Sequence, residues 1–515
     1  MEFCHEERHL DFISFLIIFV KKDGLLSVET NTNQTRKEMK IEDLVQGTSA
    51  NEWVEALSRR ATPQPQITRL RQQYDPRGHR IFDISERPDK AVRGTDGQIE
   101  RFEKVARIAL PLQRVIVERA VAFLFGHPVQ VTCATDSDGQ AGAFEAVRRT
   151  LTDNKIDSLN RRLARTILWE TEAAELWYPV PENGFWARVG RNERFSFVGQ
   201  TPSQYKLRVS LLSPSQGDGL FPLFDHYGDM TAFSRRYATV ETGVEKEYFE
   251  TYTDQEIVRF ERQEKSSWTL VERKENILGK IPVVYGRQEK SEWADVQPLI
   301  ERLEKLLSNF ADTNDYHASP KIFVTGEIRG FARKGETGAI IEGEANSTAQ
   351  YLSWQQAPES VRLEISTLLS MIYSTTQTPD ISFDSVKGLA NLSGVALRML
   401  FLDAHLKVQN KGELFGQYLE RRMNLIRRYL GVLNNALEPY IDQIEVSQRI
   451  EPFMVDDRSS MIQALNLANG GRELISQRTA VRLAGLSEDP EGEYDRIVTE
   501  RDADRLAEGS MNIGF

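Results

Sequence analysis

The first question that these 515 residues raise is which of them could do chemistry. The sequence holds no G-x-x-x-x-G-K-[ST] phosphate loop, no G-x-S-x-G nucleophile elbow and no C-x-x-C pair. The stretch "TDSDGQ" at Thr135 offers two acids and a glycine, but it lacks the remaining ligands of a calcium loop and is interpreted as a turn. No catalytic residue, metal ligand or cofactor is therefore expected.

An enzyme would need residues that only folding brings together. Adjacent acids such as Asp456 and Asp457 are common on surfaces, and nothing in the sequence sets them against a base or a metal. A metal-dependent nuclease, with ligands that converge from distant segments, stays open as the alternative function.

The composition is that of a globular protein, with 40% hydrophobic and 27% charged residues. A net charge of −11 argues against tight nucleic-acid binding by the whole chain, because such binding replaces phosphate counterions with Lys and Arg. Cys4 and Cys133 match no zinc or redox spacing and favour a reducing compartment. No apolar run reaches the roughly 18 residues of a membrane span. Acids precede the longest run, Phe12–Val20, where a signal peptide would be basic.

Helical periodicity surrounds one long strand region. Leu176–Tyr285 contains alternating or β-branched segments such as "KLRVSLL" and "EIVRFE", which predict a sheet. Helices are expected at Glu52–Arg60, Gln98–Phe125 (kinked or divided at Pro111, closing at Gly126), Phe144–Trp169, Val296–Phe310, from Pro358 onward, and Ser393–Leu430. A glycine-rich β-like insert precedes Pro358. The tail should hold a strand within "IEVSQRIEPFMV" and short helices near Met461 and Ile475, the latter capped by Ser476.

Seven segments stand out along this order of elements: "AVAFLFGHPVQV", "LLSPSQGDGLFPLFD", "KEYFETYT", "LGKIPVVY", "VQPLIERLEKLLSNFADTNDYHASPKIFVTG", "TPDISFDSVKGLANLSGVALRMLF" and "LISQRTAVRLAGLSEDPEGEYDRI". In this order and at these distances they resemble the portal proteins of tailed double-stranded DNA bacteriophages, of the siphophage and prophage type. The resemblance runs from about residue 45 to nearly the C-terminus. It departs from the family at "ETEAAELWYPV", which lacks an expected glycine, and in the first 38 residues, which have no counterpart.

The resemblance implies an α+β, mainly α fold: a portal fold with an α/β wing, a two-helix stem, a small β-containing clip, a long kinked wing helix and a helical crown. The implied segments are 1–45, an N-terminal extension; 46–292, the wing; 293–318, stem helix 1; 319–356, the clip; 357–378, stem helix 2; 379–392, the tunnel loop; 393–456, the long wing helix and return strand; and 457–515, the crown.

The implied function is structural. Portal proteins form a ring, a dodecamer in the virion, at one capsid vertex, through which double-stranded DNA is packaged and later ejected. The resemblance therefore implies self-assembly and contacts with the terminase large subunit, a head-completion or adaptor protein, and the major capsid and scaffolding proteins. It implies assembly in the cytoplasm of a bacterial host, no enzymatic activity and no membrane partner. The alternative function becomes a DNA-processing nuclease of a prophage.

The implied tunnel loop explains an odd composition. No charged residue occurs from Ser366 to Thr378, and the loop after it carries small residues and a single lysine. A loop that faces moving DNA should attract phosphates weakly, since strong contacts would slow translocation. Its candidate DNA-facing residues are Ser385, Lys387, Gly388, Asn391 and Ser393. An ordinary surface connection between helices would have the same composition, so both interpretations stay open.

The implied clip carries charges of both signs. Its candidate docking residues are Lys321, Arg329, Arg333, Lys334 and Glu336. They could form a rim for partner proteins or simply a solvated face. The first 38 residues are expected to be an upstream translation or a disordered arm, since "MKIEDLVQ" at Met39 looks like a natural start.

Overall fold

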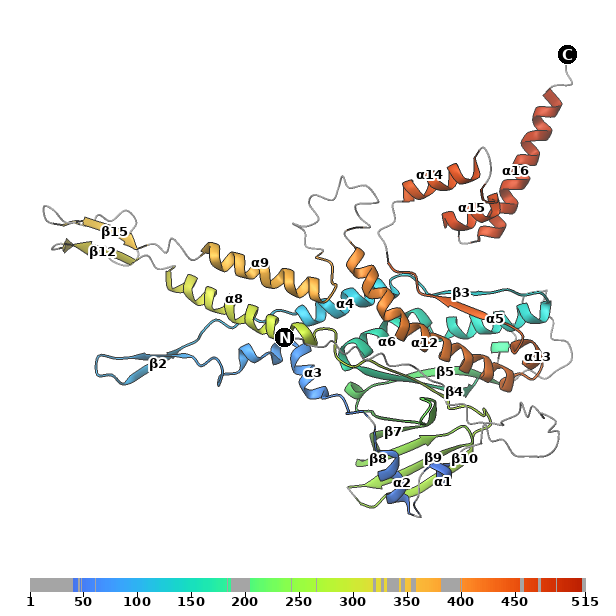
Figure 1. Cartoon of the computed structure of the whole chain (residues 1–515), viewed down its shortest axis with the longest axis horizontal. Coiled ribbons are helices and arrows are strands. Elements are labelled where there is room, and N and C mark those ends of the chain that lie inside the picture. The colour runs from blue at the N-terminus through green and yellow to red at the C-terminus, as the bar shows by residue number, and fades with distance from the viewer. Residues whose placement is uncertain are drawn as a thin grey trace, which may run out of the picture. The chain divides into compact units, whose positions relative to one another are not determined.

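The structure of the chain is a computed structural model, 50% helical and 23% strand. The chain forms two compact units, Met1–Glu38 and Met39–Phe515, and every described residue belongs to the second unit. The described residues are 40–44, 47, 49–60, 62–182, 184–186, 204–241, 243–264, 266–317, 321–325, 328–330, 342–343, 348–352, 358–380, 399, 401–453, 458–470, 474–487 and 489–511. The N-terminal extension, apart from its last few residues, lies outside them, and so does Phe12–Val20. Figure 1 shows the order of the elements along the chain.

A five-stranded antiparallel sheet has the order β10-β9-β8-β7-β6. Its strands are β6 (Gly219–Phe224), β7 (Met230–Glu241), β8 (Val244–Tyr252), β9 (Glu256–Gln263) and β10 (Thr269–Glu275). Two short helices, α1 (Ile41–Leu44) and α2 (Ala50–Leu57), bury Ile41, Val54 and Leu57 against its aromatic residues. The helix predicted at Glu52–Arg60 is confirmed as α2. It begins with a capping box in which Ser49 and Glu52 exchange hydrogen bonds.

A second sheet has the order β11-β4-β5 and carries the main core. Its strands are β4 (Glu172–Pro181), β5 (Tyr205–Leu212) and β11 (Val283–Arg287). Packed with it are α4 (Leu112–Phe125), α5 (Asp138–Asp153), α6 (Ile156–Glu170) and α12 (Leu402–Leu433). The predicted sheet region is thus confirmed. In this sheet β4 and β11 bury consecutive residues and so are covered on both faces, whereas β9 of the five-stranded sheet alternates.

The predicted start of one helix is wrong. The helix expected at Gln98–Phe125 begins only at Leu112, directly after Pro111, while β2 (Ile99–Glu103) pairs with β1 (Lys90–Arg93) as an antiparallel ribbon. Pro111 has no N–H to give an earlier turn, so it starts the helix rather than kinking it. Gly126 is the C-cap of that helix, as predicted.

The helical stretch predicted at Phe144–Trp169 forms two helices, α5 and α6, which are separated where Lys155 adopts a left-handed backbone with φ of 49°. The long helix expected from Ser393 to Leu430 is α12, which begins at Leu402 and ends at Leu433, with Phe401 in a turn before it. The predicted start of this helix, residues 393–398, lies outside the described residues, and so does residue 400. Two glycines, Gly412 and Gly416, lie within α12 without interrupting it.

The remaining elements follow the expected order. They are α3 (Ile67–Tyr74), η1 (Pro76–Gly78), η2 (Arg80–Phe82), β3 (Gln130–Cys133), η3 (Pro214–Gln216), η4 (Ala294–Val296), α8 (Gln297–His317), β12 (Lys321–Thr325), β13 (Ile328–Gly330), β14 (Glu342–Gly343), β15 (Thr348–Leu352), α9 (Pro358–Thr375), α13 (Glu438–Ile441), β16 (Val446–Arg449), α14 (Arg458–Asn469), α15 (Gln477–Ala484) and α16 (Pro490–Met511). The tail strand is β16, which pairs with β3, and Ser476 caps α15 as predicted. Within the described part of the chain, no helix is both long and apolar enough for a bilayer.

Candidate functional site

Most residues of the two predicted sites lie outside the described residues. All five tunnel-loop candidates do: Ser385, Lys387, Gly388, Asn391 and Ser393. Of the clip candidates, Lys321 lies on β12 and Arg329 on β13, whereas Arg333, Lys334 and Glu336 are also outside the described residues. The structure therefore defines the elements that lead into both segments.

The predicted clip lies between two helices that pack on each other, α8 and α9. Arg302 of α8 forms an ion pair with Glu364 of α9, at 2.7 Å, and apolar residues of both helices belong to one core cluster. Where α8 ends, β12 runs antiparallel to β15, from Lys321 opposite Leu352 to Thr325 opposite Thr348. The chain thus leaves along one helix, turns through short paired strands and returns along the other (Figure 1).

The C-terminus of α9 has a well-defined cap at the start of the predicted tunnel loop. The Thr378 N–H donates to the Tyr373 carbonyl at 2.9 Å, and the Gln377 N–H donates to the Ser374 carbonyl at 3.1 Å. Gln377 takes the left-handed conformation, with φ of 50°, that this Schellman arrangement requires. The buried Thr376 hydroxyl donates to the Ile372 carbonyl at 2.7 Å, and its oxygen lies 2.9 Å from the Thr378 hydroxyl, within hydrogen-bond distance. The helix therefore ends at a fixed place.

A buried lysine holds this cap from α12. The Lys407 ammonium donates to the Thr376 carbonyl at 2.9 Å and lies 3.0 Å from a carboxylate oxygen of Glu292. Lys411, one turn further along α12, pairs with the other oxygen of Glu292 and donates to Gln288 at 3.0 Å. A lysine in this position gives the last carbonyls of α9 a cation, which suits the negative end of the helix dipole.

An arginine of α4 binds the residue that follows this cap, Pro379. The Arg119 guanidinium donates to the Pro379 carbonyl at 2.5 Å, and its carbon lies 5.3 Å from the centre of the Tyr373 ring. The segment after Pro379 thus starts from a point fastened by two other helices. Sequence reasoning missed both Arg119 and Lys407. A weak signal existed for Lys407, since it shares a helix face with the buried Ala404 and Val408.

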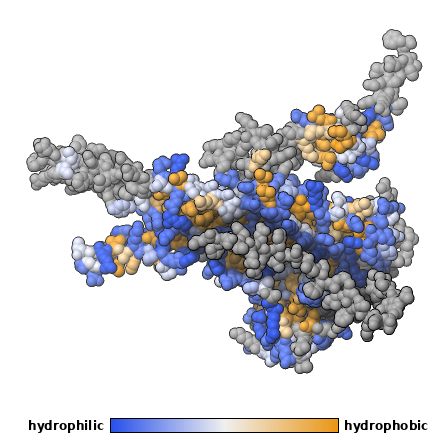
Figure 2. Space-filling model, in the orientation of Figure 1, coloured by the Kyte–Doolittle hydropathy of each residue, from blue (hydrophilic) through white to orange (hydrophobic). Residues whose placement is uncertain are grey.

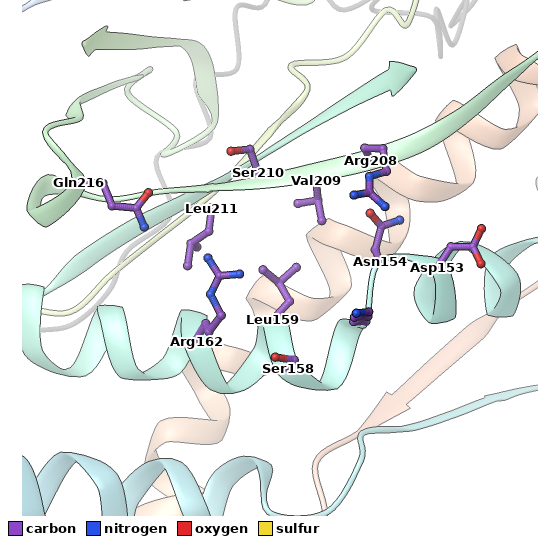
Figure 3. A pocket seen from close by; sticks show the side chains of 11 residues that line it. Asp153, Asn154, Ser158, Leu159, Arg162, Arg208, Val209, Ser210, Leu211 and Gln216 are labelled. Atoms are coloured by element: carbon purple, nitrogen blue, oxygen red, sulfur yellow. The ribbon is translucent and has the colours of Figure 1, made fainter. Parts of the chain in front are cut away.

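A polar cavity of about 380 Å³ opens between the start of α6 and β5, and Figure 3 shows its lining. Lys155, Arg162 and Arg208 supply positive charge, and the single acid of the lining, Asp153, is paired with Arg149 at 3.2 Å. The Asn154 amide donates to the Leu207 carbonyl at 2.9 Å and so joins the helix break to the strand. The cavity would attract an anion, but its lining presents no acid and base paired for proton transfer.

A second cavity of about 600 Å³ lies between the two sheets and the end of α12. Its buried acid, Glu250, accepts hydrogen bonds from Tyr252 at 2.6 Å, Tyr237 at 3.0 Å and Arg259 at 2.5 Å. Burial raises the pKa of Glu250, but the tyrosine and arginine donors outweigh burial and lower the pKa below its usual value. The same surroundings raise the pKa of Tyr237 to about 12, mainly through burial. The group is a satisfied, ionised carboxylate that stabilises the sheet.

Among the described residues, no three His, Cys, Asp or Glu side chains come together as a metal site. The stretch at Thr135 leads into α5, where Ser137 accepts a hydrogen bond from the Gln140 N–H as the N-cap. One zinc-type spacing that the sequence analysis missed does occur, since His5-Glu6-Glu7-Arg8-His9 has the form H-E-x-x-H. It lies outside the described residues.

Comparison with known proteins gives a family. Residues 61–505 match the model of the family described as phage portal protein, SPP1 Gp6-like. No curated relative matches the chain by sequence.

Solved structures give more distant likenesses. A chain of the "neck of native GTA particle computed with C12 symmetry" is 12% identical, with a TM-score of 0.39, over 85% of this chain and 99% of that chain. A chain of the "virion of native gene transfer agent (GTA) particle" is 12% identical, with a TM-score of 0.34, over 73% and 89%. A chain of the "neck of empty GTA particle computed with C6 symmetry" is 11% identical, with a TM-score of 0.36, over the same shares. The family match, which covers most of the sequence and both packed helices α8 and α9, decides the question: this chain belongs to the phage portal protein family of the SPP1 Gp6-like type.

Proposed function

We propose that this portal protein forms a closed ring, a dodecamer in the virion, at the portal vertex of a phage capsid, and that double-stranded DNA enters and leaves through it. The observation that carries the proposal is the family match over residues 61–505. The portal family is structural, and we propose that the chain itself has no catalytic activity. The energy for packaging would come from a terminase motor assembled on the ring in the host cytoplasm.

The segments proposed from the family resemblance keep their bounds: wing 46–292, stem helices 293–318 and 357–378, clip 319–356, tunnel loop 379–392, long wing helix and return strand 393–456, and crown 457–515. The bounds of α8 and α9 support the stem assignment, because each helix falls wholly within one stem segment. The short β12–β15 pairing between them supports a small β-containing clip.

The clip is proposed to dock the terminase large subunit during packaging and the head-completion protein afterwards, through Lys321, Arg329, Arg333, Lys334 and Glu336. The outer part of the ring is proposed to meet the major capsid and scaffolding proteins. These partners follow from the family's role.

The tunnel loop is proposed to touch DNA without trapping it. A ring would place one Lys387 per subunit around the duplex, inside a protein with a net charge of −11. Contacts between exposed charges are screened over a Debye length of about 8 Å at physiological ionic strength. The Thr376–Pro379 cap supports the proposal, because it gives the loop a fixed starting point.

The test has two stages. The purified full chain, examined by negative-stain microscopy and by mass measurement in solution, should form rings, and a monodisperse monomer at high concentration would refute the portal ring.

In the second stage, the amount of DNA packaged per procapsid is compared for Lys387→Ala and Lys387→Glu. The glutamate variant should package or retain less DNA than the alanine variant, because it replaces attraction by repulsion. Equal packaging by Lys387→Glu and the parent would leave the loop as a surface connection. A divalent-metal nuclease assay on the same protein tests the alternative function.

A further inference from the structure

Helix α8 has two faces that hold different parts of the chain. One side of α8 packs on α9, and its buried Leu303 and Leu306 belong to the same core cluster as Leu368 and Ile372 of α9. The residues Glu304, Ser308 and Asp312 are spaced by four and therefore share another face. At 3.6 residues per turn, this second face points away from the first. The α8–α9 pair therefore has two opposite sides. The outer surface of α9 forms one side, and the segment that packs on Glu304, Ser308 and Asp312 of α8 forms the other.

The segment around residues 80–110 covers that second face. The Leu110 N–H donates to Glu304 at 2.8 Å, the Ile108 N–H to the Ser308 hydroxyl at 2.9 Å and the Ala106 N–H to Asp312 at 2.8 Å. Glu304 and Ser308 are almost completely buried. These contacts fix the backbone of the segment along α8.

From this fixed base extends the β1–β2 ribbon, Lys90–Arg93 paired with Ile99–Glu103, which we name the arm. Its root is locked by ion pairs from Arg87 to Asp312 at 2.7 Å and from Arg107 to Asp89 at 2.8 Å. Neither strand has a further sheet partner among the described residues. A two-stranded ribbon alone is marginally stable in water, so a firmly rooted one is expected to gain stability from a partner.

The arm exposes large apolar side chains. Phe102 is 64% exposed and Ile99 is 46% exposed. Phe102 lies opposite Ala91 across the ribbon, so the pair presents an apolar spot on one face. Figure 2 shows hydrophobic residues at the surface of the arm among hydrophilic ones.

The outer side of α9 has a matching character. Opposite its buried stripe, the exposed residues Leu363, Ser366, Thr367, Ser370, Met371 and Ser374 share one face, which we name the α9 outer face. Leu363 is 68% exposed and Met371 is 50% exposed. None of the six residues is charged, so an apolar side chain can be buried over them without desolvating an ion. The exposed Glu359, one turn before Leu363 on the same side of α9, is an acid and not a cation.

From this arrangement we infer that the arm of one subunit docks on the α9 outer face of the next subunit around the ring. The inference rests on the proposed ring. The two surfaces lie on opposite sides of the α8–α9 pair, as a head-to-tail contact between identical copies requires, whereas a two-fold contact would use one patch twice. The uncharged α9 outer face supplies no cation for a phosphate, and exposed Leu363 and Met371 gain nothing from facing hydrated DNA. A second copy of this chain is therefore the occupant.

Photo-crosslinking in the full-length chain tests the contact directly. A photo-crosslinking amino acid in place of Phe102 should give covalent dimers whose crosslinked peptide maps to Pro358–Thr375 of the other copy. The same probe in place of Tyr227, an aromatic residue 82% exposed in the turn between β6 and β7, serves as the matched control and should give no such product.

Assembly provides an independent measurement. Phe102→Ser and Leu363→Gln should each raise the protein concentration needed for half-maximal ring formation at least about tenfold, which corresponds to roughly 1.4 kcal/mol. Their melting temperatures as free subunits should stay unchanged, because both side chains are already exposed. The controls are Tyr227→Ser and Arg362→Gln, the latter an exposed neighbour that points off the α9 outer face.

The outcomes separate this inference from the ring itself. Rings of wild-type protein that form equally well with Phe102→Ser and Leu363→Gln overturn the arm contact and leave the ring in place. Crosslinks from position 102 to capsid protein, or from a probe at position 363 to packaged DNA, also overturn it. Failure of the wild-type chain to form rings overturns the proposed function and this contact together.

Discussion

Lys407 and Glu292 form a buried ion pair beneath the end of α9, with 3.0 Å between the ammonium nitrogen and a carboxylate oxygen and less than a tenth of either side chain exposed. Burial lowers the pKa of Lys407 and raises that of Glu292. For Glu292 the nearby Lys407 and Lys411 outweigh burial, so its pKa lies below the ordinary value of 4.5. The carboxylate is thus ionised at neutral pH and holds the lysine that caps α9.

Glu292→Gln should destabilise the chain by about 3 kcal/mol at pH 7, because it leaves a buried ammonium without its counter-charge. A depressed carboxyl pKa gives stability that is present above pH 4.5 and lost as the pH falls through the lower folded-state value. The difference in unfolding free energy between the parent and the variant should therefore become smaller below pH 4.5. Urea unfolding of both proteins from pH 7 to pH 3 measures this difference in unfolding free energy, and a difference that stays the same down to pH 3 would contradict the ion pair.

Arg119→Met should loosen the start of the predicted tunnel loop. It removes the hydrogen bond to the Pro379 carbonyl and should cost about 1–2 kcal/mol of stability. Rings should still form, while DNA packaged per procapsid should fall. The control is Arg114→Met on the same helix, since Arg114 lies over the Tyr74 ring, away from the cap. Equal packaging by the two variants would show that this anchor has no part in DNA transport.

Arg422→Met should be among the most destabilising single changes in the chain. The Arg422 guanidinium donates to both carboxylate oxygens of Glu175, at 2.6 and 2.9 Å, and to Asn160 at 2.6 Å, with almost no exposure. Removing one partner of such a pair costs about 3–5 kcal/mol. Replacing both partners, in Arg422→Met with Glu175→Leu, should recover part of the loss. Thermal unfolding of the three proteins decides this, and a double variant no better than the single one would count against the explanation.

Gly286→Ala and Gly412→Ala should have opposite effects. A Cβ on Gly286 in β11 would lie 2.7 Å from the buried Tyr418 ring, so overpacking should cost about 1–3 kcal/mol. A Cβ on Gly412 in α12 would meet nothing within 4 Å, so better helix propensity should add about 0.5–1 kcal/mol. Denaturant midpoints of the two variants and the parent, measured side by side, test the expected loss of stability for Gly286→Ala and the expected gain for Gly412→Ala. A destabilised Gly412→Ala would mean that α12 packs there against another surface.

The sequence predicted best where one face of an element is buried. In β9, burial alternates from Glu256 to Phe260 with the period of the strand, so the pattern "EIVRFE" was readable. The stretch Ile99–Glu103 was misread as helix because both faces of the β1–β2 ribbon are exposed. Nothing in such a ribbon forces the period of two that identifies a strand.

The predicted site shows the same limit. Its segments were found through the order of elements, and the stem-like helices α8 and α9 fall where that order placed them. Lys407 and Arg119 were missed because their partners, the carbonyls of Thr376 and Pro379, are backbone atoms far away in the sequence. A backbone carbonyl is the same for every residue type, so no local pattern records such a contact.

The pairing of β16 with β3 has a consequence for synthesis on the ribosome. This pairing places Arg449 opposite Gln130, and the Phe453 N–H also donates to the Phe123 carbonyl. This edge of the core can therefore form only after residues 446–453 have been synthesised. Buried Trp177 likewise needs α12, whose Tyr429 hydroxyl donates to its carbonyl. At about 5–20 residues per second, the surface around Trp177 stays uncovered for roughly 10 to 50 s of translation. Nascent chains of this protein should therefore recruit chaperones that bind apolar segments, and ribosome profiling of chaperone-bound chains should show the signal fall once Leu433 has left the exit tunnel.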